Sequence, residues 1–289
     1  MKHHSIKTIA ALVMGAAMLF TACGGSKSLT QQQSSVLYKN TGYEMVTAAE
    51  DYYRGKVYKI TERFYQVNSS DTAALYVLHH NYNEAGYRLH RELGSQQMLQ
   101  TSDYHYANGR LVGIEEMYTQ YLSPMVMRNS YEKSNPTHIR YTHTSDGYPA
   151  TMVREMVSGD GDSIRTTLVF TCDAQGRVLE EHGDPLNNTY SYDTEGRMVS
   201  VVTVGMSSGS NEYDAKGRVA KSHLTMGGET AIYTFKYNDH GDASDIILTV
   251  SDGNSSSFHY DYTYDTHGNW LTRNDGNLLV RRSITYYGE

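Results

Sequence analysis

Cysteine, proline and tryptophan are scarce in this 289-residue chain. The two cysteines, Cys23 and Cys172, cannot form the disulfide framework of a small secreted scaffold. With 4 prolines against 25 glycines, its tight turns must be built mainly from glycine. The chain also lacks a basic tract, and its net charge is −7. It therefore does not have the electrostatic footprint of a protein that binds nucleic acid.

Tyrosine, in contrast, is abundant. There are 26 Tyr against 5 Phe and 1 Trp, so most of the aromatic surface carries a hydroxyl group that needs water or a hydrogen-bond partner. Hydrophobic residues make up 39% of the chain and charged residues 20%, which is typical of a folded globular protein and not of a disordered one. The length corresponds to one large domain or two small ones.

Residues 1–22 are expected to be a signal peptide. Lys2 and Lys7 precede an apolar run from Ile9 to Phe20, which is too short to span a bilayer as a helix. The segment that ends at Cys23 resembles the lipobox of bacterial lipoproteins, although Phe20 stands where that family usually has Leu. The resemblance implies that Cys23 is acylated and becomes the N-terminus, and losing Lys2 and Lys7 would take the net charge from −7 to −9. An ordinary secretory signal is the alternative.

Residues 23–44 are expected to be a flexible tether, because they contain runs of glycine, serine and glutamine. A β domain is expected to cover residues 45–289, and a short helix is expected over residues 44–53.

No acidic cluster follows Cys23, which favours the periplasmic side over the cell surface. The predicted location is therefore secreted and lipid-anchored to the bacterial outer membrane.

A short motif recurs along the mature chain, in which Tyr-Asp is followed after two residues by Gly-Arg. Two copies are strict, Tyr192–Met198 and Tyr213–Val219, and Cys172–Val178 differs only at its first residue. Looser copies of the motif contain Gly86, Gly109, Gly147, Gly241 and Gly268. Across all eight copies, successive motif glycines are 20 to 38 residues apart. Asp suits the start of a type I turn and Gly its left-handed end. Each copy therefore predicts a hairpin with a three-residue connection and a glycine bulge.

The predicted hairpins fix which residues face each other. Asp193 pairs across its hairpin with Arg197, and one step back Tyr192 faces Met198. The same register sets three further pairs: Tyr213 with Val219, Cys172 with Val178, and Tyr264 with Trp270. The residues assigned to structural turns are Asp173, Gly176, Asp193, Gly196, Asp214, Gly217, Asp265 and Gly268.

Eight copies with further turns between them predict about sixteen strands of roughly eight residues. The fold class is thus all-β, a long antiparallel up-and-down meander. Residues 57–67 are expected to supply an additional first strand. A sheet this wide, at about 4.8 Å per strand, is expected to curl or roll.

The motif copies resemble the YD repeats of the Rhs and teneurin-type proteins. The resemblance covers residues 80–270. In large members of that family the repeats form a spiral β-shell around a toxin or binding region, and this chain has too few repeats for such a shell. The resemblance implies the strand architecture. For activity it suggests only an accessory or remnant of a toxin-delivery system.

The serine, histidine, aspartate and cysteine residues that could act in catalysis each have a structural interpretation. Ser207 lies in a G-x-S-x-G string, but in a turn between strand-like runs, without the strand–elbow–helix setting of serine hydrolases. The histidines, among them His79 and His80, form no zinc-binding string. The repeated aspartates belong to successive turns, whereas catalytic carboxylates must converge on one pocket. Cys172 occupies a tyrosine position and is expected to be a small core residue.

The tyrosine stripe has two functional interpretations. Tyr260, Tyr262 and Tyr264 share a strand face with Phe258, and Trp270 lies opposite Tyr264. On an exposed sheet this candidate binding face would stack sugar rings or bind a peptide strand. Inside a curled sheet the same rings would be core, which is the favoured interpretation.

Together these features predict a non-catalytic binding or scaffold module of the cell envelope, with no cofactor and no metal. Its membrane contact is the lipid anchor, and its expected partner is an envelope polysaccharide or protein. The rival prediction is a hydrolase whose site the sequence does not display, which would require His and Asp partners to converge on Ser207.

Overall fold

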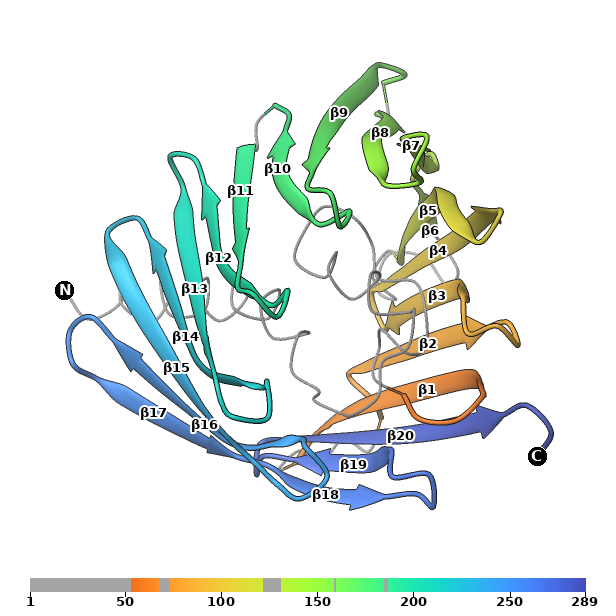
Figure 1. Ribbon diagram of the computed structural model, residues 1–289. Coiled ribbons are helices and arrows are strands. Elements are labelled where there is room, and N and C mark those ends of the chain that lie inside the picture. The colour runs from red at the N-terminus through yellow and green to blue at the C-terminus, as the bar shows by residue number, and fades with distance from the viewer. Residues whose placement is uncertain (1–52, 68–72, 122–130, 159, 185–186) are drawn as a thin grey trace. The chain divides into compact units, whose positions relative to one another are not determined.

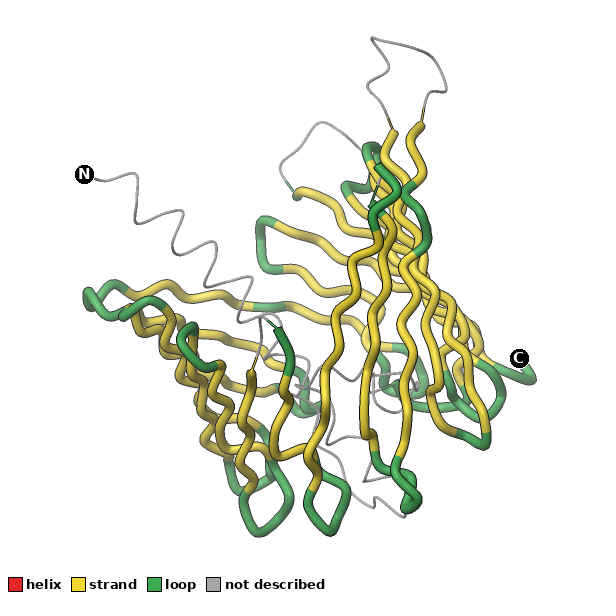
Figure 2. The backbone as a smooth tube through the Cα atoms, turned by 90° about the horizontal axis from the view of Figure 1, so that it is seen from above, coloured by secondary structure: helices red, strands yellow, loops and turns green. Residues whose placement is uncertain are grey.

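The computed structural model describes residues 53–67, 73–121, 131–158, 160–184 and 187–289. All regular elements in these ranges are β-strands, 20 in number, which confirms the all-β prediction (Figure 1, Figure 2). Within the same ranges, no helix is long and apolar enough to cross a membrane. The predicted signal peptide, the tether with Cys23, and all but the last residue of the predicted helix lie outside the described residues.

The described strands belong to two compact units. Unit 1 contains residues 169–259, and unit 2 contains the described residues up to 168 together with residues 260–289. In each unit, most strands that follow one another in sequence pair antiparallel, as the meander prediction requires. In unit 2 the sixth and seventh strands both pair with the fifth. The sequence did not indicate a division at residues 168 and 259.

Unit 1 is a run of hairpins that pair in sequence order (Figure 1). It starts where the end of β9 (Ser163–Cys172) pairs with β10. The strands that follow are β10 (Val178–His182), β11 (Asn187–Tyr192), β12 (Met198–Thr203), β13 (Ser207–Tyr213), β14 (Val219–Met226), β15 (Glu229–Tyr237), β16 (Ala243–Val250) and β17 (Ser255–His259).

Unit 2 brings both ends of the described chain into one sheet. Its N-terminal strands are β1 (Val57–Gln66), β2 (Tyr76–Tyr82), β3 (Arg88–Ser95), β4 (Met98–Ala107), β5 (Arg110–Tyr121), β6 (Tyr131–Lys133), β7 (Thr137–His143) and β8 (Pro149–Val157). Its C-terminal strands are β18 (Asp261–Tyr264), β19 (Trp270–Asn274) and β20 (Leu278–Tyr286). β1 lies between β2 and β20, so the first and last strands are hydrogen-bonded neighbours (Figure 1).

Alternating side chains build the core of each sheet. In β15, Ala231, Tyr233 and Phe235 are buried on one face, and they pack with Leu224 of β14 and Leu248 of β16. Full burial of an aliphatic or aromatic side chain contributes roughly 1.5–3 kcal/mol to folding. The corresponding cluster in unit 2 joins β1, β2 and β20 through Val57, Ile60, Tyr82 and Tyr286.

The register predicted at the repeat turns is confirmed. Tyr192 pairs with Met198, and a register shift next to this pair marks the bulge. The other three predicted pairs are also present, namely Tyr213 with Val219, Cys172 with Val178 and Tyr264 with Trp270.

The continuous strand predicted from Phe258 to Tyr264 is wrong. β17 ends at His259, where it pairs with Asp245 of β16, whereas β18 begins at Asp261 and pairs with β19. The backbone pairing therefore passes from β16 to β19 at Tyr260. Phe258 and Tyr260 belong to different units.

Candidate functional site

Each repeat turn is held by its aspartate. Asp193 Oδ1 accepts hydrogen bonds from the backbone N–H groups of Glu195 and Arg197, each at 2.9 Å. The N–H of Gly196 donates to the carbonyl of Asp193 at 3.0 Å, and its φ of +80° is a left-handed value that glycine adopts at no steric cost. The same side-chain and backbone bonds recur in three other turns, formed by Asp173 with Gly176, Asp214 with Gly217, and Asp265 with Gly268.

The arginine after the glycine turns back onto this aspartate. Arg197 Nε donates to Asp193 Oδ2 at 2.6 Å, and the strict copy at Asp214 and Arg218 has the same bond at 2.8 Å. Burial by itself would raise the pKa of Asp193, but the hydrogen bonds and the positive charge of Arg197 outweigh it and lower the pKa. The motif aspartate is therefore ionised and bound within its own turn.

The same arginines connect each hairpin to the next one along the chain. The guanidinium carbon of Arg197 lies 4.6 Å from the ring centre of Tyr213, a cation–π distance. The hydroxyl of Tyr213 donates to the carbonyl of Met198 at 2.6 Å. Two further links repeat this pattern, from Arg177 and Val178 to Tyr192 and from Arg218 and Val219 to Tyr237. We call this series the Asp–Arg–Tyr ladder.

The space next to the motif glycine differs between the repeat turns. A Cβ atom added to Gly217 would lie 3.7 Å from Nη1 of Arg197, which belongs to the preceding copy. In unit 2 the packing is tighter, because the guanidinium of Arg54 occupies the place of a Cβ atom on Gly268 and also donates to its carbonyl at 2.8 Å. Gly217 is thus required for its φ alone, since a Cβ atom there would make only an ordinary contact, whereas Gly268 is favoured both by its φ and by the close approach of Arg54.

The candidate binding face consists of half-buried rings in mutual contact. The ring centre of Tyr262 lies 6.0 Å from that of Tyr264 and 6.3 Å, edge-on, from that of Trp270. The guanidinium carbon of Arg282 lies 3.2 Å from the Trp270 ring centre, and that of Arg273 lies 5.5 Å from it. Because arginines already contact the indole, this geometry favours packing over the stacking of a sugar. Burial also raises the pKa of the Tyr260 hydroxyl.

The other catalytic candidates each lie in a β-strand. Ser207 is the first residue of β13 and pairs with Thr203, so it lies in a strand and not in the turn where the sequence placed it. His79 Nδ1 lies 2.8 Å from the hydroxyl of Thr61. Burial and the neighbouring Asp173 raise the pKa of the Cys172 thiol to about 11, so it is protonated at neutral pH. Within the described residues, no group of three His, Cys, Asp or Glu side chains is placed to hold a metal ion.

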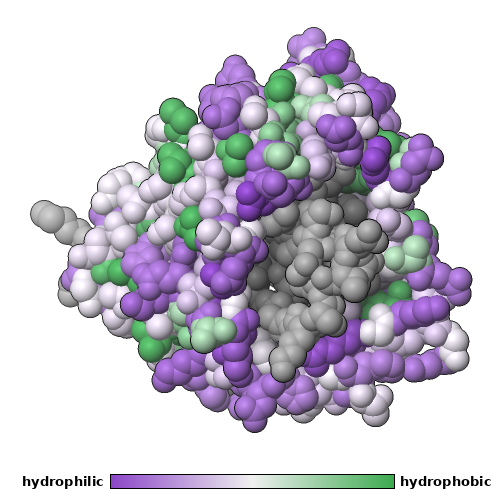
Figure 3. Space-filling model, viewed as in Figure 1, coloured by the Kyte–Doolittle hydropathy of each residue, from purple (hydrophilic) through white to green (hydrophobic). Residues whose placement is uncertain are grey.

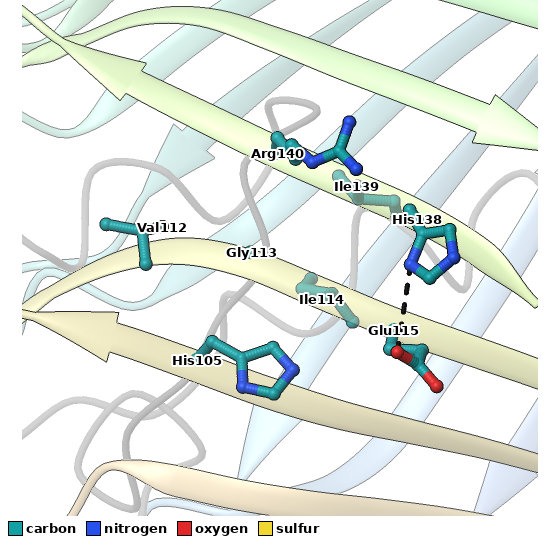
Figure 4. A pocket seen from close by; sticks show the side chains of 8 residues that line it. All are labelled: His105, Val112, Gly113, Ile114, Glu115, His138, Ile139 and Arg140. Carbon is teal, nitrogen blue, oxygen red and sulfur yellow. Dashed lines mark ion pairs between the residues drawn. The ribbon is translucent and has the colours of Figure 1, made fainter.

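A shallow depression of about 220 Å³ lies over β4, β5 and β7 of unit 2 (Figure 4). Its rim carries His105, Arg140 and the pair of His138 Nδ1 and Glu115 Oε2, which are 3.7 Å apart. Drug-sized ligands usually occupy pockets of about 300–1,000 Å³, so this hollow is small for such a ligand. The sequence did not indicate this grouping, because it depends on cross-strand register.

No family model matches the chain, and no curated protein matches it. A porin-like protein from Bacteroides uniformis aligns with 81% of this chain and 99% of its own length, at 13% identity and a TM-score of 0.36. A porin-like protein from Bacteroides vulgatus covers the same shares at 11% identity and a TM-score of 0.28. The toxin complex TcdB2-TccC3 aligns with 72% of this chain over 15% of its own, at 9% identity and a TM-score of 0.31. All three TM-scores are below 0.5, so these likenesses assign neither a fold family nor a function to this chain.

Proposed function

We propose that this chain is a non-catalytic binding or scaffold module of the bacterial cell envelope, built from YD repeats. The observation that supports this proposal is the Asp–Arg–Tyr ladder. The motif residues with the chemistry for acid–base work, such as Asp193 and Arg197, are bound to their own turn and to the next hairpin. A repeat whose polar groups hold the sheet together in this way supplies a rigid scaffold.

In this proposal Cys23 carries the lipid that attaches the scaffold to the outer membrane, on its periplasmic side. The support is the sequence of the segment that ends at Cys23. Cys23→Ser is expected to move the protein from the membrane fraction to the soluble fraction and to abolish labelling with palmitate. Unchanged labelling of this variant would contradict the anchor and leave the repeat scaffold untouched.

The binding function is tested by photo-crosslinking in living cells. A crosslinking amino acid is placed at Tyr76, which is 47% exposed in unit 2, or at Val204, which is 64% exposed in unit 1. The expected result is a discrete adduct with an envelope polysaccharide or protein from at least one of these positions. The matched control carries the same amino acid at Phe235, which is 7% exposed. Equal adducts from the buried and exposed positions, or none from either exposed position, would contradict the proposal.

A further inference from the structure

Two arginines face each other across the seam between the first and last strands of unit 2. Arg63 of β1 and Arg281 of β20 are direct cross-strand partners, and both are exposed. Like charges placed directly opposite in a sheet repel each other and destabilise it. Within the described residues, no carboxylate lies within 4.0 Å of either guanidinium group. Arg281 lies 5.4 Å from the ring centre of Tyr65, which supplies no negative charge.

Three other exposed arginines of this unit, among them Arg140 and Arg154, have acidic partners. Arg140 lies 2.7 Å from Glu155, and Arg154 lies 3.3 Å from Glu116. The neighbour of Arg281 in β20, Arg282, points to the opposite face and lies 2.5 Å from Glu62, with side-chain exposures of 9% and 10%. Within the described residues, Arg63 and Arg281 lack an acidic partner of this kind.

Other groups on the same face add positive charge and hydrogen-bond donors. Lys59 pairs with Thr285, and Thr61 pairs with Ser283, next to the two arginines along the seam. Burial is the main cause that lowers the pKa of His79, and the charges of Lys59 and Arg63 lower it further, against the opposing effect of Glu92. A protein of net charge −7 thus carries a local positive field on this face.

We propose that Arg63 and Arg281 form a binding site for a phosphate group, with the hydroxyl of Ser283 as a further donor and Lys59 as an additional positive charge along the seam. A guanidinium group offers paired N–H donors that match phosphate oxygens, and two such groups at cross-strand distance bind one phosphate from both sides. The anion cancels the repulsion between the arginines, so binding stabilises the seam. The site does not depend on the lipid at Cys23.

The test uses the full chain with Cys23→Ser, so that no lipid holds it on a membrane, and measures calorimetric binding of pyrophosphate together with thermal unfolding. Pyrophosphate is expected to bind saturably and to raise the Tm. Arg63→Gln and Arg281→Gln are each expected to weaken binding about tenfold or more. Without the anion, each is expected to raise the Tm by about 1–3 °C, because a like-charge repulsion is removed. The control is Arg140→Gln, which makes the same charge change elsewhere on unit 2 and should leave the affinity unchanged.

A second arm identifies the source of the phosphate. Vesicles of phosphatidylglycerol are compared with vesicles of phosphatidylcholine by cosedimentation. Binding to the anionic vesicles that is lost in Arg281→Gln would assign a lipid headgroup, and binding of pyrophosphate alone would assign a soluble phosphate. The proposal is overturned if neither probe binds saturably, if Arg140→Gln weakens binding as much as Arg281→Gln, or if Arg63→Gln and Arg281→Gln lower the Tm in the absence of anion.

Discussion

At the scale of single residues, the repeat motif is explained by three local requirements. The aspartate must accept two backbone N–H groups, the glycine must adopt a positive φ, and the arginine must return to the aspartate. All three lie within five residues of chain, as in Asp193–Arg197. This is why the sequence alone predicted the turns and their register correctly.

The close approach of arginine to the motif glycine leads to a first prediction. Gly268→Ala and Gly253→Ala both place a side chain at a φ just above +80°, but Gly253 has open space around it, whereas Arg54 lies against Gly268. The backbone strain alone is expected to cost about 1 kcal/mol in the free energy of unfolding. Gly268→Ala is expected to cost roughly 0.5–1 kcal/mol more, because Arg54 must move. Urea denaturation measures both, and equal losses would contradict the packing role of this glycine.

The lowered pKa of the motif aspartates makes the stability of the fold depend on pH. Burial opposes ionisation of Asp173, Asp193, Asp214 and Asp265, but hydrogen bonds outweigh it and lower each pKa below the ordinary value. A carboxyl group with a lowered folded-state pKa stabilises the fold above its unfolded pKa of about 3.9, and this contribution is lost as the pH falls through the folded value. Stability is therefore expected to fall between about pH 5 and pH 2.

Asp193→Asn separates this effect from general acid denaturation. The amide keeps an oxygen that can accept the turn N–H groups but loses the charge opposite Arg197. The variant is expected to be less stable at pH 7 and to show a shallower loss of stability on acidification. An unchanged slope would assign the acid sensitivity to other carboxyl groups.

At the scale of elements, the ladder binds one hairpin to the next. Tyr213→Phe removes only the hydroxyl that donates to Met198 and keeps the ring beneath Arg197. The expected cost is about 0.5–1.5 kcal/mol in the free energy of unfolding. Tyr76→Phe is the matched control, since Tyr76 is 47% exposed, and it should change stability by less than about 0.5 kcal/mol. Equal effects in the two variants would show that the hydroxyl does not link the hairpins.

The sequence predicted these hairpins but not how the chain ends meet. Hairpin register depends on residues a few positions apart, such as Tyr192 and Met198. The seam between β1 and β20 joins residues 220 positions apart, such as Glu62 and Arg282, and no local pattern specifies that pairing. For the same reason the sequence did not reveal the opposed arginines, and it did not show that the strand through Tyr260 changes partner.

At the scale of the whole molecule, the seam fixes both ends of the described chain in unit 2. The ion pair of Glu62 and Arg282 is nearly buried within it, with exposures of 10% and 9%. Glu62→Met or Arg282→Met alone leaves one buried charge without its partner and is expected to cost roughly 3–5 kcal/mol. The double variant Glu62→Met with Arg282→Met is expected to recover much of that loss, because no charge then remains buried. Additive losses in denaturant titrations would contradict this account of the seam.

The most direct test of the central claim, that the motif residues act by tying hairpins together, is a double-mutant cycle on Arg197 and Tyr213. The free energy of unfolding is measured for the native chain, Arg197→Ala, Tyr213→Ala and the double variant. The ladder predicts a coupling energy of about 0.5–2 kcal/mol, because the guanidinium carbon lies 4.6 Å from the tyrosine ring centre. Losses that add within about 0.3 kcal/mol would show that the two residues stabilise the fold independently and would contradict the claim.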